Sequence, residues 1–271
     1  MKYIQENSTN TLFLIYTSFD SVYTVNKFSN NQEFMSNSLQ ISEIAISIVA
    51  KNLNPAVLNP DFLKYTGIIP ADWELANQPV YNNNLVQLVY KNGVGIIVQP
   101  NRLNVLEMIG TKNPAEIQVA AIASQLIDKL SQIEYQAVGI NPKGFVSFPS
   151  ETDAYQYICD KLLSPGSWQE FEGSKVNASL ELSYPLKRGV LNLAINRVNL
   201  QYGEQIAPAI LFSGNLSYPL LSNTITEKIQ DLQQVIGNWQ NDVKTFQKLL
   251  GEKFLPLSSS EQAISGSVFL N

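Results

Sequence analysis

The strongest constraint on the fold is an order of strand and helix patterns that occurs twice along the 271 residues. The first series consists of a strand at 44–50, a short helix at 60–66, three strands within 86–108 and a long helix at 114–133. The second consists of a strand at 135–148, a helix at 151–163, three strands within 175–217 and a long helix at 225–250. Apolar residues recur at helical or at alternating spacing in these segments. We therefore predict an α+β protein of two pseudo-equivalent β-α-β-β-β-α halves, with long helices covering a single antiparallel sheet.

Boundary signals support this division. Asn113-Pro114 and Asn59-Pro60 place a capping residue before a proline at the first helical position, and Thr224 with Glu227 forms a capping box. Asn92-Gly93 is the dipeptide preferred in a tight hairpin turn. The strand at 135–148 contains Pro142-Lys143-Gly144, which allows either one long strand or a hairpin.

Four segments follow from these boundaries. Residues 41–133 form the first half and residues 134–254 form the second half. Residues 1–40 precede the repeated pattern, and we expect a hairpin extension there, formed by Thr11–Thr17 and Val22–Phe28. Residues 255–271 form a Ser-rich tail that ends in apolar residues.

The chain contains no histidine and a single cysteine, Cys159. Histidine is the commonest general base and metal ligand, so its absence excludes Ser–His–Asp triads, Cys–His pairs and mixed zinc sites. Cys159 falls in a predicted helix beside apolar residues, and we expect it to be buried and unreactive. We expect no cofactor and no metal. One cysteine cannot form an internal disulfide, which is typical of a cytoplasmic protein.

Charge limits the classes of partner. Charged residues make up 15% of the chain, against about 25% in average proteins. The net charge is −5, and no basic cluster is present to neutralise phosphates. We therefore expect neither a nucleic-acid partner nor a membrane. A weakly charged surface favours association, so a protein partner or a homo-oligomer is expected. A neutral amino-acid bias of the source genome explains the composition equally well.

Asp72 and Glu74 are the only candidates for catalysis, and Trp73 lies between them in a predicted loop. Two carboxylates beside an aromatic platform are typical of carbohydrate-active enzymes, which need no histidine. Solvated carboxylates in a loop are the alternative.

Two charged residues continue the apolar phase of predicted strands. Arg197 follows Leu193 and Ile195, and Glu107 follows Val105. A buried charge must be paired, so we predict a structural salt bridge for each residue if it is buried. The alternative for Arg197 is recognition of an anion on the concave face of the sheet.

A five-residue sequence, Leu-Ser-Tyr-Pro-Leu, occurs at 182–186 and again at 216–220. Proline cannot donate a hydrogen bond within a sheet, so both copies should mark the ends of strands. The alternative is that Tyr184 and Tyr218 form one aromatic binding edge.

The run from Tyr135 to Asn141 follows a long helix and contains Gly139-Ile140-Asn141. This run and the order of elements over 44–250 resemble a sporadically distributed bacterial family of conserved hypothetical proteins. The resemblance implies a strand with a Gly-aliphatic-Asn signature after the first long helix and another long helix near the C-terminus. Gln136 and Ala137 stand where that family carries arginines. The resemblance implies a bacterial source and assigns no activity.

The function expected from the sequence is that of a non-enzymatic cytoplasmic binding or assembly subunit, which presents a sheet or helix face to a protein partner. One alternative is a carbohydrate- or small-ligand-active enzyme that uses Asp72 and Glu74. The other alternative is a small-molecule binding module with an apolar pocket between sheet and helices.

Overall fold

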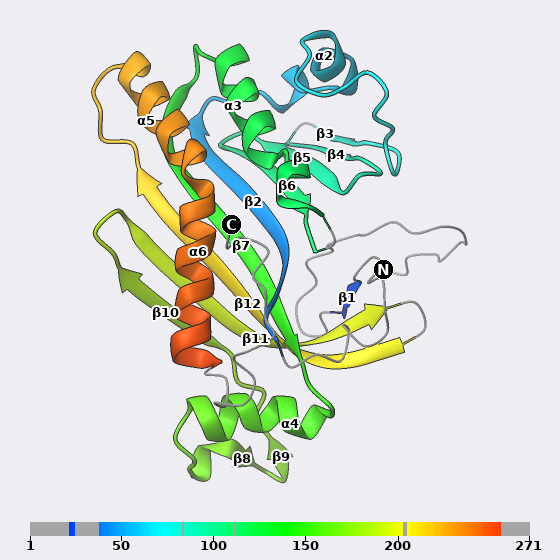
Figure 1. Cartoon of the computed structure of the whole chain (residues 1–271), viewed down its shortest axis with the longest axis vertical. Coiled ribbons are helices and arrows are strands. Elements are labelled where there is room, and N and C mark those ends of the chain that lie inside the picture. Colours follow the sequence, from blue (N-terminus) through cyan, green and yellow to red (C-terminus); the bar gives the residue numbers. More distant parts are fainter. Residues whose placement is uncertain (1–21, 25–37, 83, 111, 203–204, 256–271) are drawn as a thin grey trace.

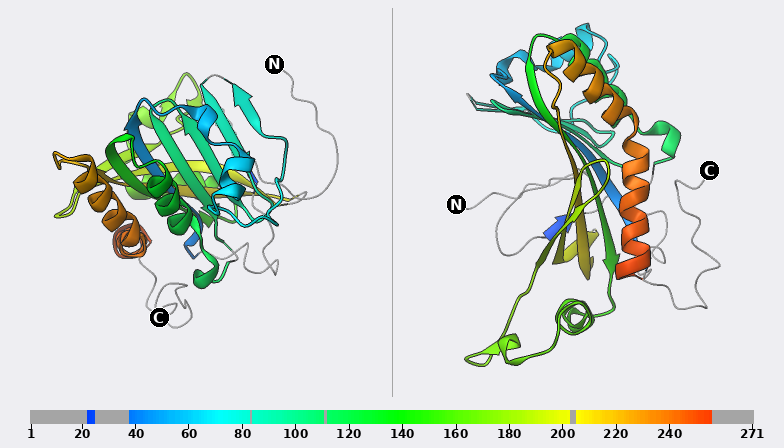
Figure 2. Two further views of the ribbon diagram at one scale, coloured as in Figure 1. Left: turned by 90° about the horizontal axis from the view of Figure 1, so that it is seen from above. Right: turned by 90° about the vertical axis from the view of Figure 1, so that its left-hand side faces the viewer.

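The computed structural model describes residues 22–24, 38–82, 84–110, 112–202 and 205–255, and all structural statements concern these residues. One large twisted sheet forms a layer, and the long helices lie against one of its faces (Figures 1 and 2). These helices are α3 (Val119–Lys129), α5 (Ile225–Gly237) and α6 (Trp239–Leu249). The predicted α+β class with a large antiparallel sheet is confirmed.

The first series of elements follows the expected order. It contains β2 (Gln40–Lys51), the 3-10 turn η1 (Pro55–Val57), α2 (Pro60–Tyr65), β3 (Val80–Asn82), β4 (Leu85–Val89), β5 (Val94–Gln99), β6 (Arg102–Met108), η2 (Pro114–Glu116) and α3. Asn59 caps α2 as predicted, because its side chain accepts a hydrogen bond of 2.9 Å from the backbone N–H of Phe62. Gly93 has a φ of 84° in the turn between β4 and β5, a conformation that favours glycine.

The second series has the same order, with one added hairpin. It contains β7 (Glu134–Ser147), α4 (Glu151–Gln156), the wider helical segment η3 (Tyr157–Leu162), η4 (Ser167–Gln169), the hairpin β8 (Glu170–Phe171) and β9 (Ser174–Lys175), β10 (Leu180–Pro185), β11 (Val190–Tyr202), β12 (Gln205–Pro219), α5, α6 and η5 (Leu250–Phe254). The capping box of Thr224 and Glu227 opens α5. As expected, β10 ends at Pro185 and β12 ends at Pro219.

The strand order places β2 and β7 together at the centre of the sheet. On one side of this antiparallel pair lie β6, β5, β4 and β3, and on the other side lie β12, β11 and β10. The short strand β1 (Val22–Thr24) pairs in parallel with Asn199–Gln201 of β11. The two series therefore form one continuous sheet. The internal duplication that the element order suggests stays a prediction.

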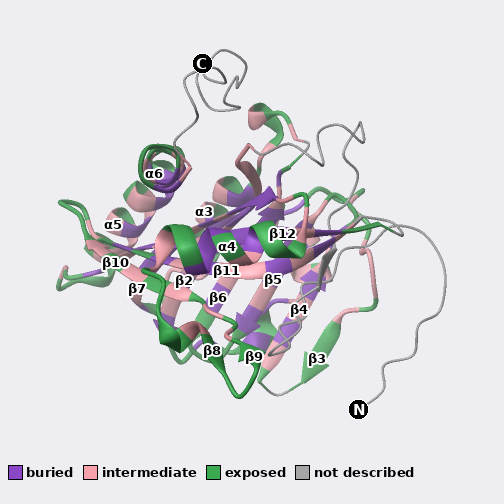
Figure 3. Cartoon of the chain, turned by 90° about the horizontal axis from the view of Figure 1, so that it is seen from below, coloured by how far each residue is buried: buried purple, intermediate pink, exposed green. Residues whose placement is uncertain are grey.

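The core lies between the sheet and its helices. Alternate strand residues such as Ile44, Ile46 and Ile48 point toward the helices and are fully buried. Two clusters fill this layer: one includes α3 and α5, and the other includes η3 and Phe246 of α6. Figure 3 shows α6 with its buried residues on the side that faces the strands.

The structure decides between the two alternatives for the strand at 135–148, and it differs from the sequence prediction at two helices. β7 is one continuous strand rather than a hairpin, and Pro142 is accommodated where the pairing with β12 is interrupted between Lys143 and Ile140. The helix expected at 225–250 is divided at Asn238, which caps α5 and precedes α6. The helix expected at 114–133 consists of η2 and α3, because the side chain of Glu107 binds the first N–H groups of α3.

Parts of two other predictions lie outside the described residues. The first is the hairpin proposed for Thr11–Thr17 and Val22–Phe28, of which only β1 is described. The second is the tail beyond Leu255. Among the helices of the described ranges, none combines the length and hydrophobicity needed to cross a bilayer.

Candidate functional site

The face of the sheet opposite Ile44, Ile46 and Ile48 is the candidate site, and we call it the helix-free face. The buried apolar side chains of α3, α5 and α6 pack in the two clusters on the other face. The right-hand view of Figure 2 shows α5 and α6 on one side of the sheet only. Strand register identifies the residues of the helix-free face, because side chains alternate between the two faces. Ser47 is paired with Asn104 on β6 and with Gly139 on β7.

Four uncharged polar side chains form a hydrogen-bonded row across this face, which we call the amide network. Asn104, Ser47, Asn141 and Asn215 supply it from β6, β2, β7 and β12. Ser47 Oγ donates to Asn104 Oδ1 over 2.5 Å, and Asn141 Nδ2 donates to Ser47 Oγ over 3.0 Å. Asn215 Nδ2 donates to Asn141 Oδ1. The row therefore fixes each amide in one orientation and crosses the middle of the sheet.

The two ends of the amide network keep unused hydrogen-bonding atoms. Within the described residues, neither Asn104 Nδ2 nor Asn215 Oδ1 has a hydrogen bond. Asn104 and Asn215 are half-buried, so these atoms are accessible to a partner at the surface. Adjacent strands lie about 4.8 Å apart, so the donor and the acceptor are separated by roughly 14 Å across three strand spacings. A partner with complementary groups can thus be oriented on the face.

An ion pair and an apolar cluster lie toward one end of the same face. Glu43 and Lys143 are 2.9 Å apart, and their side chains are only 3% and 16% exposed. Beyond them, Phe145, Val198, Leu200 and neighbouring alanine and leucine residues of β7, β11 and β12 form a third buried cluster. The partly exposed area of the helix-free face is therefore centred on the amide network, which carries no charge.

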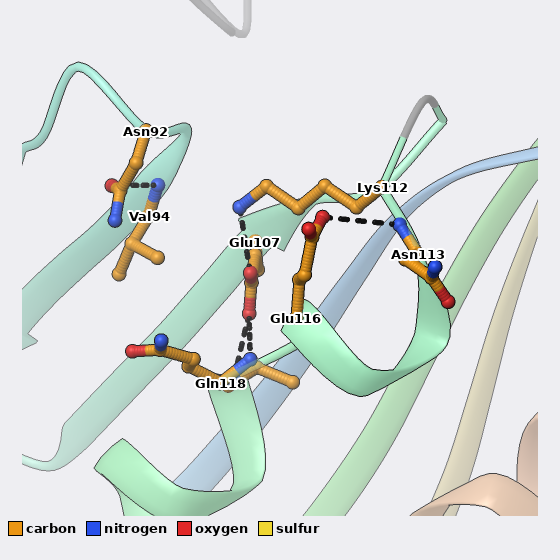
Figure 4. Close-up of polar contacts among 8 residues, drawn as sticks. Asn92, Val94, Glu107, Lys112, Asn113, Glu116 and Gln118 are labelled. Atoms are coloured by element: carbon orange, nitrogen blue, oxygen red, sulfur yellow. Dashed lines mark hydrogen bonds and ion pairs between the residues drawn. The ribbon is translucent and has the colours of Figure 1, made fainter.

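Glu107 is buried and paired, as predicted (Figure 4). One carboxylate oxygen accepts hydrogen bonds of 2.7 Å from the backbone N–H groups of Gln118 and Val119, and the other lies 2.7 Å from Lys112 Nζ. A carboxylate at a helix N-terminus is stabilised by the unpaired N–H groups there. Glu107 therefore anchors α3 to β6 and has a structural role.

We predicted a salt bridge for Arg197 only if it is buried, and this condition is not met in the structure. Its side chain is half-buried, donates a hydrogen bond of 3.1 Å to Asn177 Oδ1 and lies over the ring of Tyr155 at 5.5 Å from the centroid. Cation–π contact with Tyr155 of α4 takes the place of the carboxylate. Arg197 also has the same phase as Leu193 and Ile195, so it belongs to the helix-covered face rather than to the concave helix-free face.

The two tyrosines of the repeated pentapeptide also lie on the helix-covered face. Tyr184 is half-buried on β10 and contacts both main clusters. Tyr218 is buried on β12, and its hydroxyl donates a hydrogen bond of 2.7 Å to Asp242 Oδ1 of α6. Arg188, in the turn between β10 and β11, lies 2.5 Å from the same oxygen. These contacts attach α6 to the end of β12 and to the turn between β10 and β11. Whether the tyrosines also bind a ligand stays a prediction.

Asp242 has an unusual environment for a carboxylate. Burial raises its pKa above the ordinary value of 3.8, while the hydrogen bond from Tyr218 and the charge of Arg188 act in the opposite direction. The second oxygen, Oδ2, is buried without a hydrogen-bond partner in the described structure. The folded state therefore binds the carboxyl proton more tightly than the unfolded state.

This pKa shift predicts how stability depends on pH. The contribution of Asp242 to the free energy of unfolding is fully present below pH 3.8 and is lost as the pH rises through the raised folded-state pKa. Asp242→Asn does not titrate at this site. We expect the wild type to lose stability relative to Asp242→Asn as the pH increases from acidic values to neutrality, measured by urea unfolding at each pH. A constant difference, or one of the opposite sign, would contradict this expectation.

The structure does not bring the three residues of the predicted catalytic site together on one surface. Asp72 and Glu74 are exposed, whereas Trp73 is half-buried and packs against Tyr90 with ring centroids 5.5 Å apart. Glu74 is paired with Lys91, and this hydrogen bond lowers the pKa of the Glu74 carboxyl. A general acid needs a raised pKa. The contacts of Glu74 therefore give no support to its use as a catalytic acid, and Trp73 fills the core instead of forming an open platform.

The last two kinds of candidate site are a reactive cysteine and a metal centre. Cys159 is buried in the second cluster, as predicted. Across the described ranges, no group of three or more His, Cys, Asp or Glu residues is placed to hold a metal ion.

The amide network was missed by our sequence analysis. Asn104, Asn141 and Asn215 are ordinary polar residues at solvent-facing positions of strands, and each residue alone carries no signal. A usable signal was that each of three predicted strands carries an asparagine at a position where the side chain points away from the apolar face. Comparison with protein families and with curated proteins found no match for this chain. The resemblance of the run Tyr135–Asn141 to a bacterial family stays a prediction.

Proposed function

We propose that this protein is a non-enzymatic binding or assembly subunit, which presents the helix-free face of its sheet to a protein partner. The observation that carries this proposal is the amide network, four polar side chains in one ordered row on a sheet face that no described helix covers. A face of this kind has the composition of a protein-binding surface, because charged residues are depleted at the centre of protein interfaces.

The uncharged polar side chains of the amide network favour a partner whose contacting surface is also uncharged. Each amide offers both a donor and an acceptor, as backbone groups and the side chains of Asn, Gln, Ser and Thr do. The charges of Glu43 and Lys143 on this face neutralise each other, and both side chains are nearly buried. The face therefore provides specificity through hydrogen bonds in fixed orientations and little electrostatic attraction at long range.

The continuous sheet provides the rigidity that such a surface requires. β2 and β7 are each paired on both sides, so the centre of the amide network lies on strands that cannot shift independently. We also propose that the two series of elements are duplicated halves. The strand order is equivalent on the two sides of the β2–β7 pair. Outward from β2 lie β6, β5 and β4, and outward from β7 lie β12, β11 and β10. In each half, the last, middle and first strands of the meander therefore follow the central strand. The duplication would explain how so wide a face arose.

Charge insertion on the face tests the function. Asn104→Asp with Asn192→Asp adds two negative charges to the helix-free face, and it leaves intact the oxygen of residue 104 that accepts from Ser47. We expect the tagged double variant to capture a specific native partner about tenfold less well than the wild type does. This corresponds to a loss of about 1.4 kcal/mol in binding free energy. Retention is measured by quantitative mass spectrometry after capture from an extract of the source organism.

The matched control is Asn223→Asp with Asn241→Asp, which adds the same charges at exposed positions before α5 and on α6. The control should capture the partner at wild-type level. Equal retention by both double variants would show that the helix-free face is not the binding surface, and capture of no specific protein by the wild type would count against a binding role.

A further inference from the structure

The strand β10 forms an edge of the sheet. It pairs along its whole length with β11, from Leu180 opposite Ile195 to Pro185 opposite Val190, without a register shift. On its other side no strand of the described ranges is present, and Figure 1 shows β10 at the margin of the sheet. Natural edge strands are usually short, or are protected by charged side chains, proline, bulges or a covering element. In β10, Glu181 and Pro185 are residues of these kinds, and the register of any added strand must accommodate both. β3, at the opposite edge, is protected by its length of 3 residues, whereas β10 has 6.

The hydrogen-bonding groups on this edge can be assigned from the adjacent turn. Leu186 N–H donates to Gly189 O and Gly189 N–H donates to Leu186 O, so these residues form a doubly bonded pair. Bonded and non-bonded pairs alternate along an antiparallel ladder. The backbone groups of Leu180, Leu182 and Tyr184 therefore point toward β11. Those of Glu181 and Ser183 point outward, and Pro185 contributes only a carbonyl.

The side chains on β10 divide in the same alternating way. Leu180, Leu182 and Tyr184 are half-buried and pack against the core on the helix-covered face. Glu181 and Ser183 are exposed on the helix-free face. An added strand with the same alternation would cover the partly exposed apolar row and satisfy the outward backbone groups.

We propose that β10 pairs in an antiparallel manner with β10 of a second copy of this chain, about a twofold axis at Leu182. In this register Glu181 lies opposite Ser183 of the second copy, so the outward N–H and C=O groups of both residues are paired. Leu182 lies opposite its own copy, and Leu180 lies opposite Tyr184. The sheets of the two copies thereby become continuous.

Neighbouring registers are less favourable for physical reasons. Shifting the axis by one residue toward the N-terminus places Glu181 opposite Glu181, and like charges directly opposite each other are destabilising. Shifting the axis by one residue toward the C-terminus places Glu181 opposite Pro185, which has no N–H to donate. Of these three registers, the one centred on Leu182 avoids both defects. This inference goes beyond the proposed function, because it concerns pairing at the sheet edge rather than a partner on the helix-free face.

The solution mass of the purified full chain tests the dimer. We expect about twice the chain mass of 30.2 kDa by light scattering on a sizing column at micromolar concentrations. Ser183→Pro removes an outward N–H that β11 does not use, so the monomer should fold while the dimer dissociation constant rises at least about tenfold. Ser183→Ala keeps this N–H and should dimerise as the wild type does. A wild type of 30.2 kDa at every concentration, or equal dimerisation of the proline and alanine variants, would refute the proposal.

Cross-linking tests the register and does not depend on how Ser183→Pro folds. Residues opposite each other in a non-bonded antiparallel pair have Cα atoms about 4.5 Å apart, within the range of roughly 4.4–6.8 Å for a disulfide. In a Cys159→Ala background, Leu182→Cys should form a disulfide-linked dimer under mild oxidation. Ser183→Cys, which lies opposite Glu181, should cross-link far less. The reverse order, or no cross-link at residue 182, would rule out this register.

Discussion

Replacing Glu107 by alanine is expected to lower the free energy of unfolding by about 3–5 kcal/mol, the usual cost of removing one partner of a buried ion pair. The change leaves Lys112, whose side chain is 20% exposed, without its carboxylate. It also removes the acceptor for the backbone N–H groups of Gln118 and Val119 at the start of α3. Equilibrium urea unfolding, followed by both fluorescence and circular dichroism, measures the loss.

Two other variants define the cause of this loss. Glu107→Gln keeps an oxygen for the helix N–H groups and removes the charge, so its stability should fall between those of the wild type and Glu107→Ala. Glu116→Ala removes an exposed carboxylate of the adjacent capping box, and it should cost about 1 kcal/mol or less. If Glu116→Ala were as damaging as Glu107→Ala, the importance of Glu107 as the anchor between β6 and α3 would be refuted.

Replacing Phe246 by alanine is expected to cost about 3–5 kcal/mol, because the ring is fully buried between α6 and the sheet. Gly214 of β12 lies directly beneath this ring. A Cβ atom at Gly214 would be 2.8 Å from Phe246 Cδ2 and 3.2 Å from Pro142 Cγ. Gly214→Ala alone should therefore cost about 1–3 kcal/mol through overpacking.

The double variant tests whether these two residues act on each other. With Phe246→Ala, space opens above Gly214, so the added methyl group should be tolerated at least about 0.5 kcal/mol better than in the wild type. Gly237→Ala at the end of α5 is the control, since nothing lies within 4 Å of its added Cβ and alanine favours helix. Additive losses for Gly214→Ala and Phe246→Ala would show that the close contact between sheet and helix is not limiting.

Local signals predicted most of the elements because their causes are local. Asn59, Ser150 and Thr224 cap the helices that follow them, and each accepts a hydrogen bond from a backbone N–H within three residues along the chain. The prolines at 185 and 219 end their strands because they lack an N–H. The division of α5 from α6 at Asn238 was missed, since the apolar stripe continues across it and the periodicity shows no interruption.

The candidate site was less predictable than the elements. The sequence indicated that Glu107 must be paired if buried, because an isolated buried charge is too costly. It did not identify Lys112 as the partner, nor the bond to α3. The same argument did not apply to Arg197, which is only half-buried, donates a hydrogen bond to Asn177 and lies over the ring of Tyr155. Asp242 was not identified, because a polar residue in an amphipathic helix is ordinary in sequence. Only the tertiary structure shows that Tyr218 and Arg188 lie against it.

The sequence by itself determined the class of fold, the positions of helix caps and strand ends, and the absence of any imidazole group. Each of these properties depends on residue identity or on contacts a few positions along the chain. Only the tertiary structure decided which strands are neighbours, which face the helices cover and which amides meet across the sheet. Asn104, Asn141 and Asn215 are separated by tens of residues, and strand pairing alone brings them into one row. That pairing is set by the combined burial of a whole apolar face, which no local pattern specifies.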